Sequence, residues 1–223
     1  MQKQSSSESL PNVLSPTVPT DIGIRSQRQR IVDAMIITCA EKTYAETTIS
    51  DIVSAASISR TTFYKRFPDK RSCFEATLDH CIDEVEAAVA ASTSADDQPQ
   101  EAVRKASAAV LSLMASRPEL ARLLAAEAVA VDPRINSRYR ALLLPAIEGL
   151  WNGDLPRAGM SPGLAFGRIQ LLLFGQVAAG RAGRLPELHP EVVYLALAPF
   201  AGHDEALRES RIAEETTLDP EPT

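Results

Sequence analysis

Apolar residues recur along most of the chain with the spacing of an α-helix, and Pro or Gly residues separate the periodic segments. No segment shows the alternation of apolar and polar residues that marks a half-buried β-strand. The periodicity predicts helices over about 26–42, 48–56, 59–67, 69–91, 100–116, 118–130, 133–152, 162–183 and 190–200. The sequence therefore predicts an all-α fold of about nine helices, in which three short or medium helices precede longer ones.

The expected helix starts carry residues that favour them. Four polar residues precede early helices and can accept hydrogen bonds from the first free backbone N–H groups: Ser26, Thr48, Ser59 and Asp69. Four prolines lie near later starts, where the missing N–H costs little: Pro118, Pro133, Pro162 and Pro190. The proline at position 68 should end the third helix.

Both ends of the chain have the composition of disordered tails. Residues 1–24 are rich in Ser, Pro, Gln and Thr and show no apolar period, whereas residues 209–223 are acidic and end in Asp-Pro-Glu-Pro-Thr. The whole chain has 45% apolar residues, and the part between the tails is long enough to bury a core. We expect two helical domains there, over residues 25–71 and 72–208.

Charge is distributed unevenly between these domains. The whole chain has a net charge of −6, yet residues 25–72 carry nine Lys and Arg against five Asp and Glu, which gives this segment +4. The rest of the chain therefore carries −10. A polyanion such as double-stranded DNA should approach the N-terminal domain and be repelled by the rest.

The cysteines and the hydropathy indicate a cytoplasmic location. The three cysteines are an odd set, and no secretory signal precedes them. Gly175 and Gln176 interrupt the longest apolar run, around 171–174, well short of the roughly 20 residues that a membrane span needs. We therefore expect no membrane partner.

Residues 48–67 have the pattern of a helix-turn-helix. Two short helices are joined by a turn of three residues, and the second carries Phe63 and Phe67 on one face. At 100° per residue, Arg60, Tyr64 and Lys65 project from the opposite face, together with a threonine at position 61. These residue types suit contacts with bases and phosphates. The alternative is an ordinary solvated helix face, the usual role of a cluster of charges.

The segment TTISDIVSAASISRTTFYKRFPDK, residues 47–70, resembles the N-terminal signature of the tetracycline-repressor (TetR) family of transcription regulators, and the resemblance extends from Ile31 to Phe74. It implies a dimeric, all-helical repressor whose third helix enters the major groove of operator DNA and whose C-terminal domain binds a small effector. This chain departs from the family pattern at three residues. Ser57 and Thr43 stand where the family usually has glycine, and Thr61 stands where it usually has Gly or Pro. Ser57 in a left-handed turn should cost about 1 kcal/mol relative to glycine.

The resemblance also assigns the expected DNA contacts. These are Thr48, Arg60, Thr61, Thr62, Tyr64, Lys65 and Lys70. Thr48, Tyr64 and Lys70 match positions that usually hold phosphates, and the others match positions that face bases or nearby backbone.

The C-terminal domain offers two weaker assignments. The apolar, glycine-rich segment 164–182 indicates close helix crossing, and the family forms its dimer with its last two helices; the alternative is burial within one subunit. The residues expected near a dimer interface are Leu171, Phe174, Ala178, Val193, Leu197 and Phe200. The possible lining of an effector pocket is Tyr139, Trp151, Phe166, Arg168 and Gln170, although aromatic residues at helical spacing are more often core.

Two other sequence patterns give weaker evidence of function. Gly159-Met160-Ser161-Pro162-Gly163 matches the hydrolase pattern G-x-S-x-G, but Pro162 has no N–H for an oxyanion and no strand precedes it, so we expect no enzyme. Cys73, His80 and Cys81 are one ligand short of a metal site, so we expect no metal or cofactor and interpret the cysteines as buried structural thiols, with redox or metal sensing as the alternative.

Together, these patterns predict a ligand-responsive, dimeric DNA-binding regulator. Two other interpretations are a helical ligand-binding dimer that no longer reads DNA and an architectural protein that binds DNA without sequence preference.

Overall fold

The computed structural model describes residues 20–130 and 162–218, and every regular element in these ranges is helical. The elements are α1 (Thr20–Glu41), α2 (Ile49–Ala55), α3 (Arg60–Tyr64), α4 (Lys70–Ser92), α5 (Pro99–Ser116), α6 (Pro118–Arg122), the π-helical η1 (Leu123–Glu127), α7 (Ala128–Ala130), α9 (Pro162–Ala178), the 3₁₀-helical η2 (Ala182–Leu188), α10 (His189–Ala201) and α11 (His203–Leu218). The predicted all-α fold is confirmed. The predicted helix over 133–152 and the tail residues 1–19 and 219–223 lie outside the described residues.

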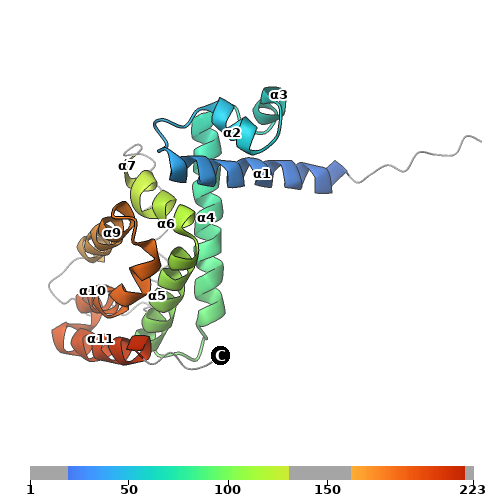
Figure 1. The fold of residues 1–223 in the computed structure, drawn as a ribbon. Helices are drawn as coiled ribbons and strands as arrows, with labels where there is room; N and C mark the ends of the chain where they lie inside the picture. The colour runs from blue at the N-terminus through green and yellow to red at the C-terminus, as the bar shows by residue number, and fades with distance from the viewer. Residues whose placement is uncertain (1–19, 131–161, 219–223) are drawn as a thin grey trace, which may run out of the picture.

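Helices α1, α2 and α3 form one end of the molecule, and α4 runs from this end to the opposite one (Figure 1). Helix α5 packs beside α4, and α9, α10 and α11 lie on the other side of α5. Helix α1 contacts α4, α6 and η1, so the N-terminal end is joined to the rest through more than one element.

The predicted caps position the short helices. The side chain of Thr48 accepts a hydrogen bond from the backbone N–H of Asp51 at 3.2 Å, and the Asp51 carboxylate accepts one from the Thr48 N–H at 2.8 Å, which completes a capping box. Ser59 accepts from the Thr62 N–H at 3.1 Å. Asp69 accepts from the Ser72 N–H at 2.7 Å and starts α4. Helix α3 ends at Tyr64, earlier than the predicted residue 67.

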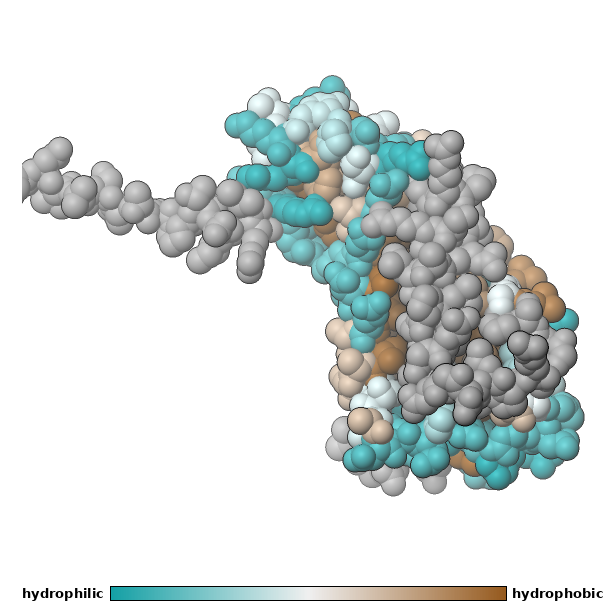
Figure 2. All heavy atoms as spheres, turned by 180° about the vertical axis from the view of Figure 1, so that it is seen from behind, coloured by the Kyte–Doolittle hydropathy of each residue, from teal (hydrophilic) through white to brown (hydrophobic). Residues whose placement is uncertain are grey.

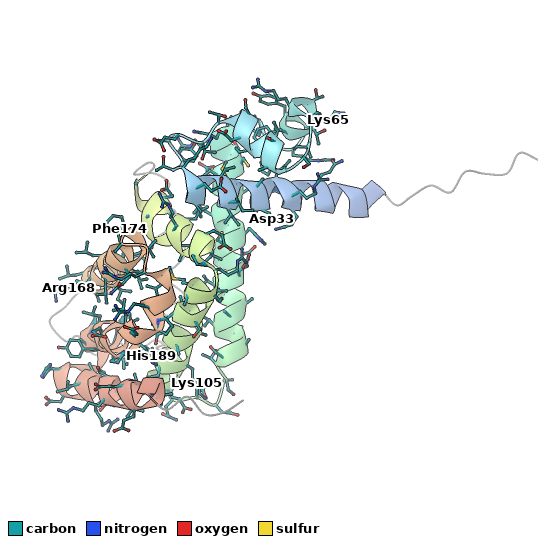
Figure 3. The ribbon with its side chains drawn as sticks, viewed as in Figure 1. Asp33, Lys65, Lys105, Arg168, Phe174 and His189 are labelled. Atoms are coloured by element: carbon teal, nitrogen blue, oxygen red, sulfur yellow. The ribbon has the colours of Figure 1, made fainter. Side chains whose placement is uncertain are left out.

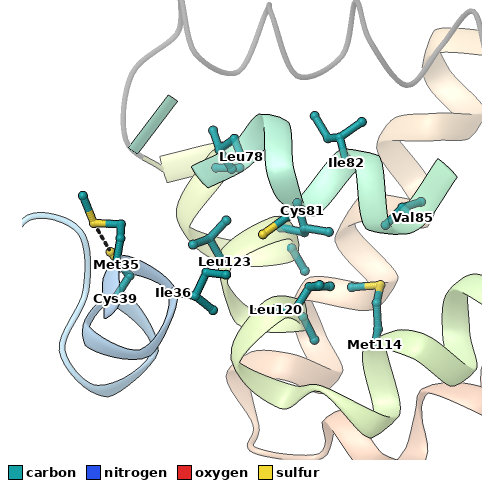
Figure 4. Close-up of a cluster of buried hydrophobic side chains, with 14 of the residues drawn as sticks. Met35, Ile36, Cys39, Leu78, Cys81, Ile82, Val85, Met114, Leu120 and Leu123 are labelled. Carbon is teal, nitrogen blue, oxygen red and sulfur yellow. Dashed lines mark hydrogen bonds between the residues drawn. The ribbon is translucent and has the colours of Figure 1, made fainter. Parts of the chain in front are cut away.

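A single large hydrophobic cluster extends from α1–α4 into α6, η1, α9 and η2. In Figure 4, Ile36 of α1 faces Leu78 of α4 and Leu123 of η1, and all three side chains are at most 4% exposed. A second cluster joins α5 to α10 and α11. The N-terminal helices therefore share a continuous core with the C-terminal domain, so a packing change in one can be felt in the other.

The prediction that residues 209–223 form a disordered tail is wrong over 209–218, because α11 continues to Leu218. Ala206, Glu209 and Ala213 are buried and lie on one face of this helix at spacings of three and four residues. Glu209 also pairs with Arg104 of α5 at 3.0 Å. The N-terminal tail is shorter than predicted as well, since α1 begins at Thr20.

The predicted helix over 162–183 ends at Ala178, because Gly180 has a φ of 70° and the chain continues as η2. The predicted helix over 118–130 is present as α6, η1 and α7, with a π-helical turn in its middle. Within the described ranges, none of the helices has the length and apolarity needed to cross a membrane.

Candidate nucleic-acid interface and ligand cavity

Helix α3 separates its apolar and polar side chains as predicted. Phe63 is fully buried and Phe67 is 3% exposed, whereas Tyr64 is 53% exposed. Arg60 and Lys65 are exposed as well, and so is the threonine at position 61, while Thr62 is half-buried. Lys65 projects outward at the end of the molecule formed by α2 and α3 (Figure 3). The outer face of α3 is therefore free to meet a partner, with its two phenylalanines holding it to the core.

The turn between α2 and α3 contains the expected left-handed residue. Ser57 has a φ of 51°, a region that glycine adopts more readily than serine. Arg30 of α1 stabilises this turn, because its guanidinium donates hydrogen bonds to the backbone carbonyls of Ala56 and Ser57, the latter at 2.9 Å. Sequence reasoning missed this role of Arg30, since 26 residues separate it from Ala56 and no local pattern links them.

Arg60, the first residue of α3, donates a hydrogen bond to the hydroxyl of Ser50 in α2. This contact ties the two helices of the motif together on their exposed side. It also holds the guanidinium at the surface, beside the N-terminus of α2, where the helix dipole favours an anion.

Thr48 and Lys70, two of the predicted phosphate contacts, already bind protein groups. The Thr48 hydroxyl donates to Asp51 at 2.7 Å. The Lys70 ammonium donates to the carbonyls of Tyr44 and Thr47, both at 2.8 Å, and lies 4.2 Å from the centroid of the Tyr44 ring. An ammonium has three donors, so one remains for a phosphate. Lys70 therefore fixes the loop before α2 whether or not DNA is bound.

Asp51 supplies a negative charge beside the start of α2. Its carboxylate accepts hydrogen bonds from Lys42 at 2.7 Å and from Thr48, and these bonds hold its pKa well below the usual range. Asp51 is therefore ionised and paired, and it stabilises the start of α2.

A cavity of about 180 Å³ lies among α4, α5, η1, α9 and α10. The described residues that line it are Ile82, Val85, Val89, Val103, Ala106, Ser107, Val110, Leu111, Met114, Leu124, Phe166, Ile169, Gln170, Leu173, Val192 and Ala196. Phe166 and Gln170 were predicted to line a pocket and do so. Arg168 does not, because it is exposed on the outer side of α9 (Figure 3). The other two candidates, Tyr139 and Trp151, lie outside the described residues. The cavity-lining residues of α4 and α5 were not predicted, because their apolar spacing is the same as that of residues in a filled hydrophobic core.

The six residues predicted near a dimer interface divide into two groups. Leu171 is 70% exposed, Phe174 is 44% exposed, and Ala178 is exposed on the same helix. The other three, Val193, Leu197 and Phe200, are at most 3% exposed and belong to the cluster that joins α5, α10 and α11. For these three, burial within one subunit is the correct interpretation, since their helix packs against α11.

The outer side of α9 carries the exposed Leu164, Leu171 and Phe174 together with the exposed Arg168, and hydrophobic side chains gather at this edge of the molecule (Figure 2). At Gly167 and Gly175, an added Cβ would meet no atom of the described chain within 4 Å. Close helix crossing at these glycines therefore does not occur among the described elements.

The cysteines are buried structural thiols, as predicted. Cys39, Cys73 and Cys81 are free and each is fully buried. Burial raises the pKa of Cys39 to about 11 and the pKa values of Cys73 and Cys81 to about 12. A thiol that stays protonated is a poor nucleophile and a poor metal ligand. Within the described ranges, no group of three His, Cys, Asp or Glu residues could hold a metal ion.

The N-terminal domain also matches a family of known proteins. Residues 31–77, which contain α2, α3 and the start of α4, match the family described as bacterial regulatory proteins, tetR family. The chain therefore has a DNA-binding domain of the tetR type. It is a DNA-binding transcription regulator. A comparison with curated protein sequences gives no match.

Solved structures of tetR-family regulators share the fold. A TetR family transcription regulator from Marinobacter aquaeolei VT8 is 21% identical with a TM-score of 0.61, over 88% of this chain and 97% of that chain. SmeT, the repressor of the Stenotrophomonas maltophilia multidrug efflux pump SmeDEF, is 19% identical with a TM-score of 0.62, over 78% of this chain and 89% of that chain. FadR from Bacillus subtilis, in complex with stearoyl-CoA, is 19% identical with a TM-score of 0.60, over 78% of this chain and 98% of that chain. At these identities the likeness concerns the fold.

Proposed function

We propose that this tetR-family regulator is a cytoplasmic repressor that binds a pseudo-palindromic operator as a homodimer and leaves it when a small effector binds. The observation that carries the proposal is the outer face of α3. It presents Arg60, Tyr64 and Lys65 to solvent on a helix that two buried phenylalanines anchor. These side chains match the donors that read base edges and phosphates in a major groove.

The charge distribution supports the orientation of binding. Residues 25–72 carry +4 within a chain of −6, so a duplex is attracted to the end formed by α1, α2 and α3. Lys105, on α5, lies towards the opposite end from Lys65 (Figure 3). Of the two, Lys65 is the cation placed to meet DNA.

The exposed apolar side of α9 supports the homodimer. Leu164 is 54% exposed and Leu171 is 70% exposed, and with Phe174 they form an apolar stripe that the exposed Arg168 borders. A second copy can cover this stripe, and the exposed glycines at 167 and 175 allow its helix to approach closely. Two copies related by a twofold axis then place two α3 helices on one side of a duplex, as a palindromic operator requires.

The cavity supports release by an effector. Helix α4 contributes Ile82, Val85 and Val89 to the cavity, and its N-terminal end carries Lys70, which holds the loop before α2. A ligand that binds better when α4 is displaced shifts the population towards a spacing of the α3 helices that does not fit the operator. Release requires this preference, because a ligand that binds both arrangements equally shifts nothing.

Selection of bound fragments from a genomic library at near-physiological salt tests the proposal. We expect one enriched palindrome. Retention of nothing would overturn DNA binding, and uniform retention would indicate an architectural protein.

Variants of the α3 face then test the contact residues on the selected operator. Tyr64→Ala and Lys65→Ala should each weaken binding by about tenfold or more without changing the unfolding midpoint, because both side chains are exposed. The matched control is Lys105→Ala, which removes the same charge from α5. Unchanged affinity in both α3 variants would remove this face from the interface.

A further inference from the structure

We propose that the cavity binds a neutral ligand with a hydrocarbon group of about six to eight carbons, whose single polar group is bound by Gln170. The inference rests on the proposed role of this cavity as the effector site and specifies which chemistry the site selects. It follows from the walls, the polar groups and the size of the cavity.

The described walls disfavour a charged ligand. Of the sixteen described residues that line the cavity, fourteen are apolar and none is ionisable. An ammonium or carboxylate there would lose hydration and find no opposite charge among the described lining residues, which is a large cost. The hydrocarbon part of a ligand gains free energy from the same walls in proportion to the apolar area that it buries.

Two polar side chains are among the described residues that line the cavity, and one of them already makes hydrogen bonds within its own helix. The Ser107 hydroxyl bonds to the carbonyls of Val103 and Arg104 in its own helix, at 2.7 and 3.0 Å. Gln170 is half-buried on α9, and its amide makes no side-chain hydrogen bond within the described part of the chain. An amide both donates and accepts, so it can bind a hydroxyl, ester, lactone or amide group equally well. Gln170 is therefore the specificity-determining residue of this cavity.

The volume limits the hydrocarbon. A dry cavity of about 150 Å³ lined by Leu, Ile and Phe binds benzene. The present cavity is slightly larger, at about 180 Å³, and its lining is of the same kind. It should therefore be filled by six to eight carbons, and a longer chain has to leave part of its length outside the cavity.

Titration calorimetry of the full chain with a series of 1-alkanols, from 1-butanol to 1-dodecanol, tests the size limit. We expect the affinity to rise about fourfold with each methylene up to 1-hexanol or 1-octanol, as expected for a buried CH₂, and then to level off. An affinity that continues to rise to 1-dodecanol, or the absence of binding by every alkanol, would overturn the inference.

Charged and apolar probes of matched size test the chemistry. Hexanoate and hexylammonium should bind at least tenfold more weakly than 1-hexanol, and equal binding by either would contradict a neutral site. Gln170→Leu should weaken 1-hexanol about fivefold, the value of one neutral hydrogen bond, while leaving toluene unchanged. The control is Gln176→Leu on the same helix, outside the cavity lining, which should change neither probe.

The same titrations, repeated with the selected operator present, separate this inference from the proposed function. Alkanols that bind as expected but do not release the operator leave the assigned chemistry intact and contradict the effector role. Operator binding without any alkanol binding contradicts the assigned chemistry and leaves DNA recognition intact.

Discussion

The Glu127 carboxylate accepts a hydrogen bond from the backbone N–H of Tyr44 at 2.8 Å, across 83 residues of sequence. Tyr44 lies in the loop that leads from α1 to α2, and its ring packs against Phe74 at 4.4 Å between centroids. Glu127 is 7% exposed in the π-helical turn η1, and Leu124 of the same turn lines the cavity. This short turn therefore contacts both the DNA-binding domain and the candidate ligand site.

Glu127→Ala should destabilise the protein by about 1–3 kcal/mol, because it leaves the partly buried Tyr44 N–H without its acceptor. Glu127→Gln keeps a carbonyl oxygen and should cost less. The free energy of unfolding in urea, together with hydrogen exchange at the Tyr44 amide, measures the effect. If both variants match the unmodified protein and the Tyr44 amide stays protected, this bond does not hold the two domains together.

Ser57→Gly should stabilise the protein by up to about 1 kcal/mol, because glycine adopts the φ of 51° at this turn without a Cβ penalty. The matched control is Ser54→Gly, a substitution of an exposed residue within α2, which should destabilise by about 0.5 kcal/mol. Thermal unfolding of both variants measures the difference. A lower midpoint for Ser57→Gly would show that the left-handed turn costs nothing with serine.

The local features of the DNA-binding domain could be predicted because they depend on residues close in sequence. The caps at Thr48, Ser59 and Asp69 form as their side chains predict. Phe63 and Phe67 face inward as expected, because the Phe67 N–H donates to the Phe63 carbonyl at 2.9 Å and so extends the helical turn beyond the end of α3. The left-handed conformation at Ser57 occurs where the resemblance places the usual turn glycine. Such features require no knowledge of which helices pack together.

Features that depend on distant packing could not be predicted. Arg30 and Glu127 bind backbone groups far away in sequence, and neither position has a local signal. Helix α11 was concealed by its acidic composition, because its buried face is built from two alanines and the paired Glu209 instead of large apolar residues. In the C-terminal domain, the apolar periodicity of α10 predicts a buried face. It does not tell whether that face packs against the core of its own subunit or against a partner subunit.

Stability should rise with pH across the interval just below pH 6.5 because of His189. This side chain is 5% exposed, and its Nε2–H donates to the Arg104 carbonyl at 3.0 Å. Burial lowers the pKa of His189 below the value of 6.5, despite the opposing effect of that hydrogen bond. The unfolded chain therefore binds a proton at a higher pH than the folded chain does, so the free energy of unfolding falls as the pH falls through this interval.

His189→Gln should flatten this pH dependence. The slope of the free energy of unfolding against pH should fall by at most about 1.4 kcal/mol per pH unit, the contribution of one proton. The measurement is urea unfolding between pH 5 and 8. His203→Gln is the matched control, since His203 is exposed at the start of α11. A dependence that persists in His189→Gln, or disappears in His203→Gln, would assign the titration elsewhere.

Leu171→Asp should convert the protein to a monomer, because it places a charge at the centre of the apolar stripe on α9. The substitution should leave folding of the single chain intact, since 70% of this side chain is exposed before any partner binds. Leu207→Asp is the control on α11, a helix that lies apart from α9 (Figure 1), and Leu207 is 36% exposed. Sedimentation velocity measures the oligomeric state of each.

A monomeric variant should also bind the operator at least a hundredfold more weakly, because two linked domains bind with a high effective concentration that single domains lack. A wild-type monomer, or a dimer that survives Leu171→Asp and dissociates in Leu207→Asp, would place the interface elsewhere.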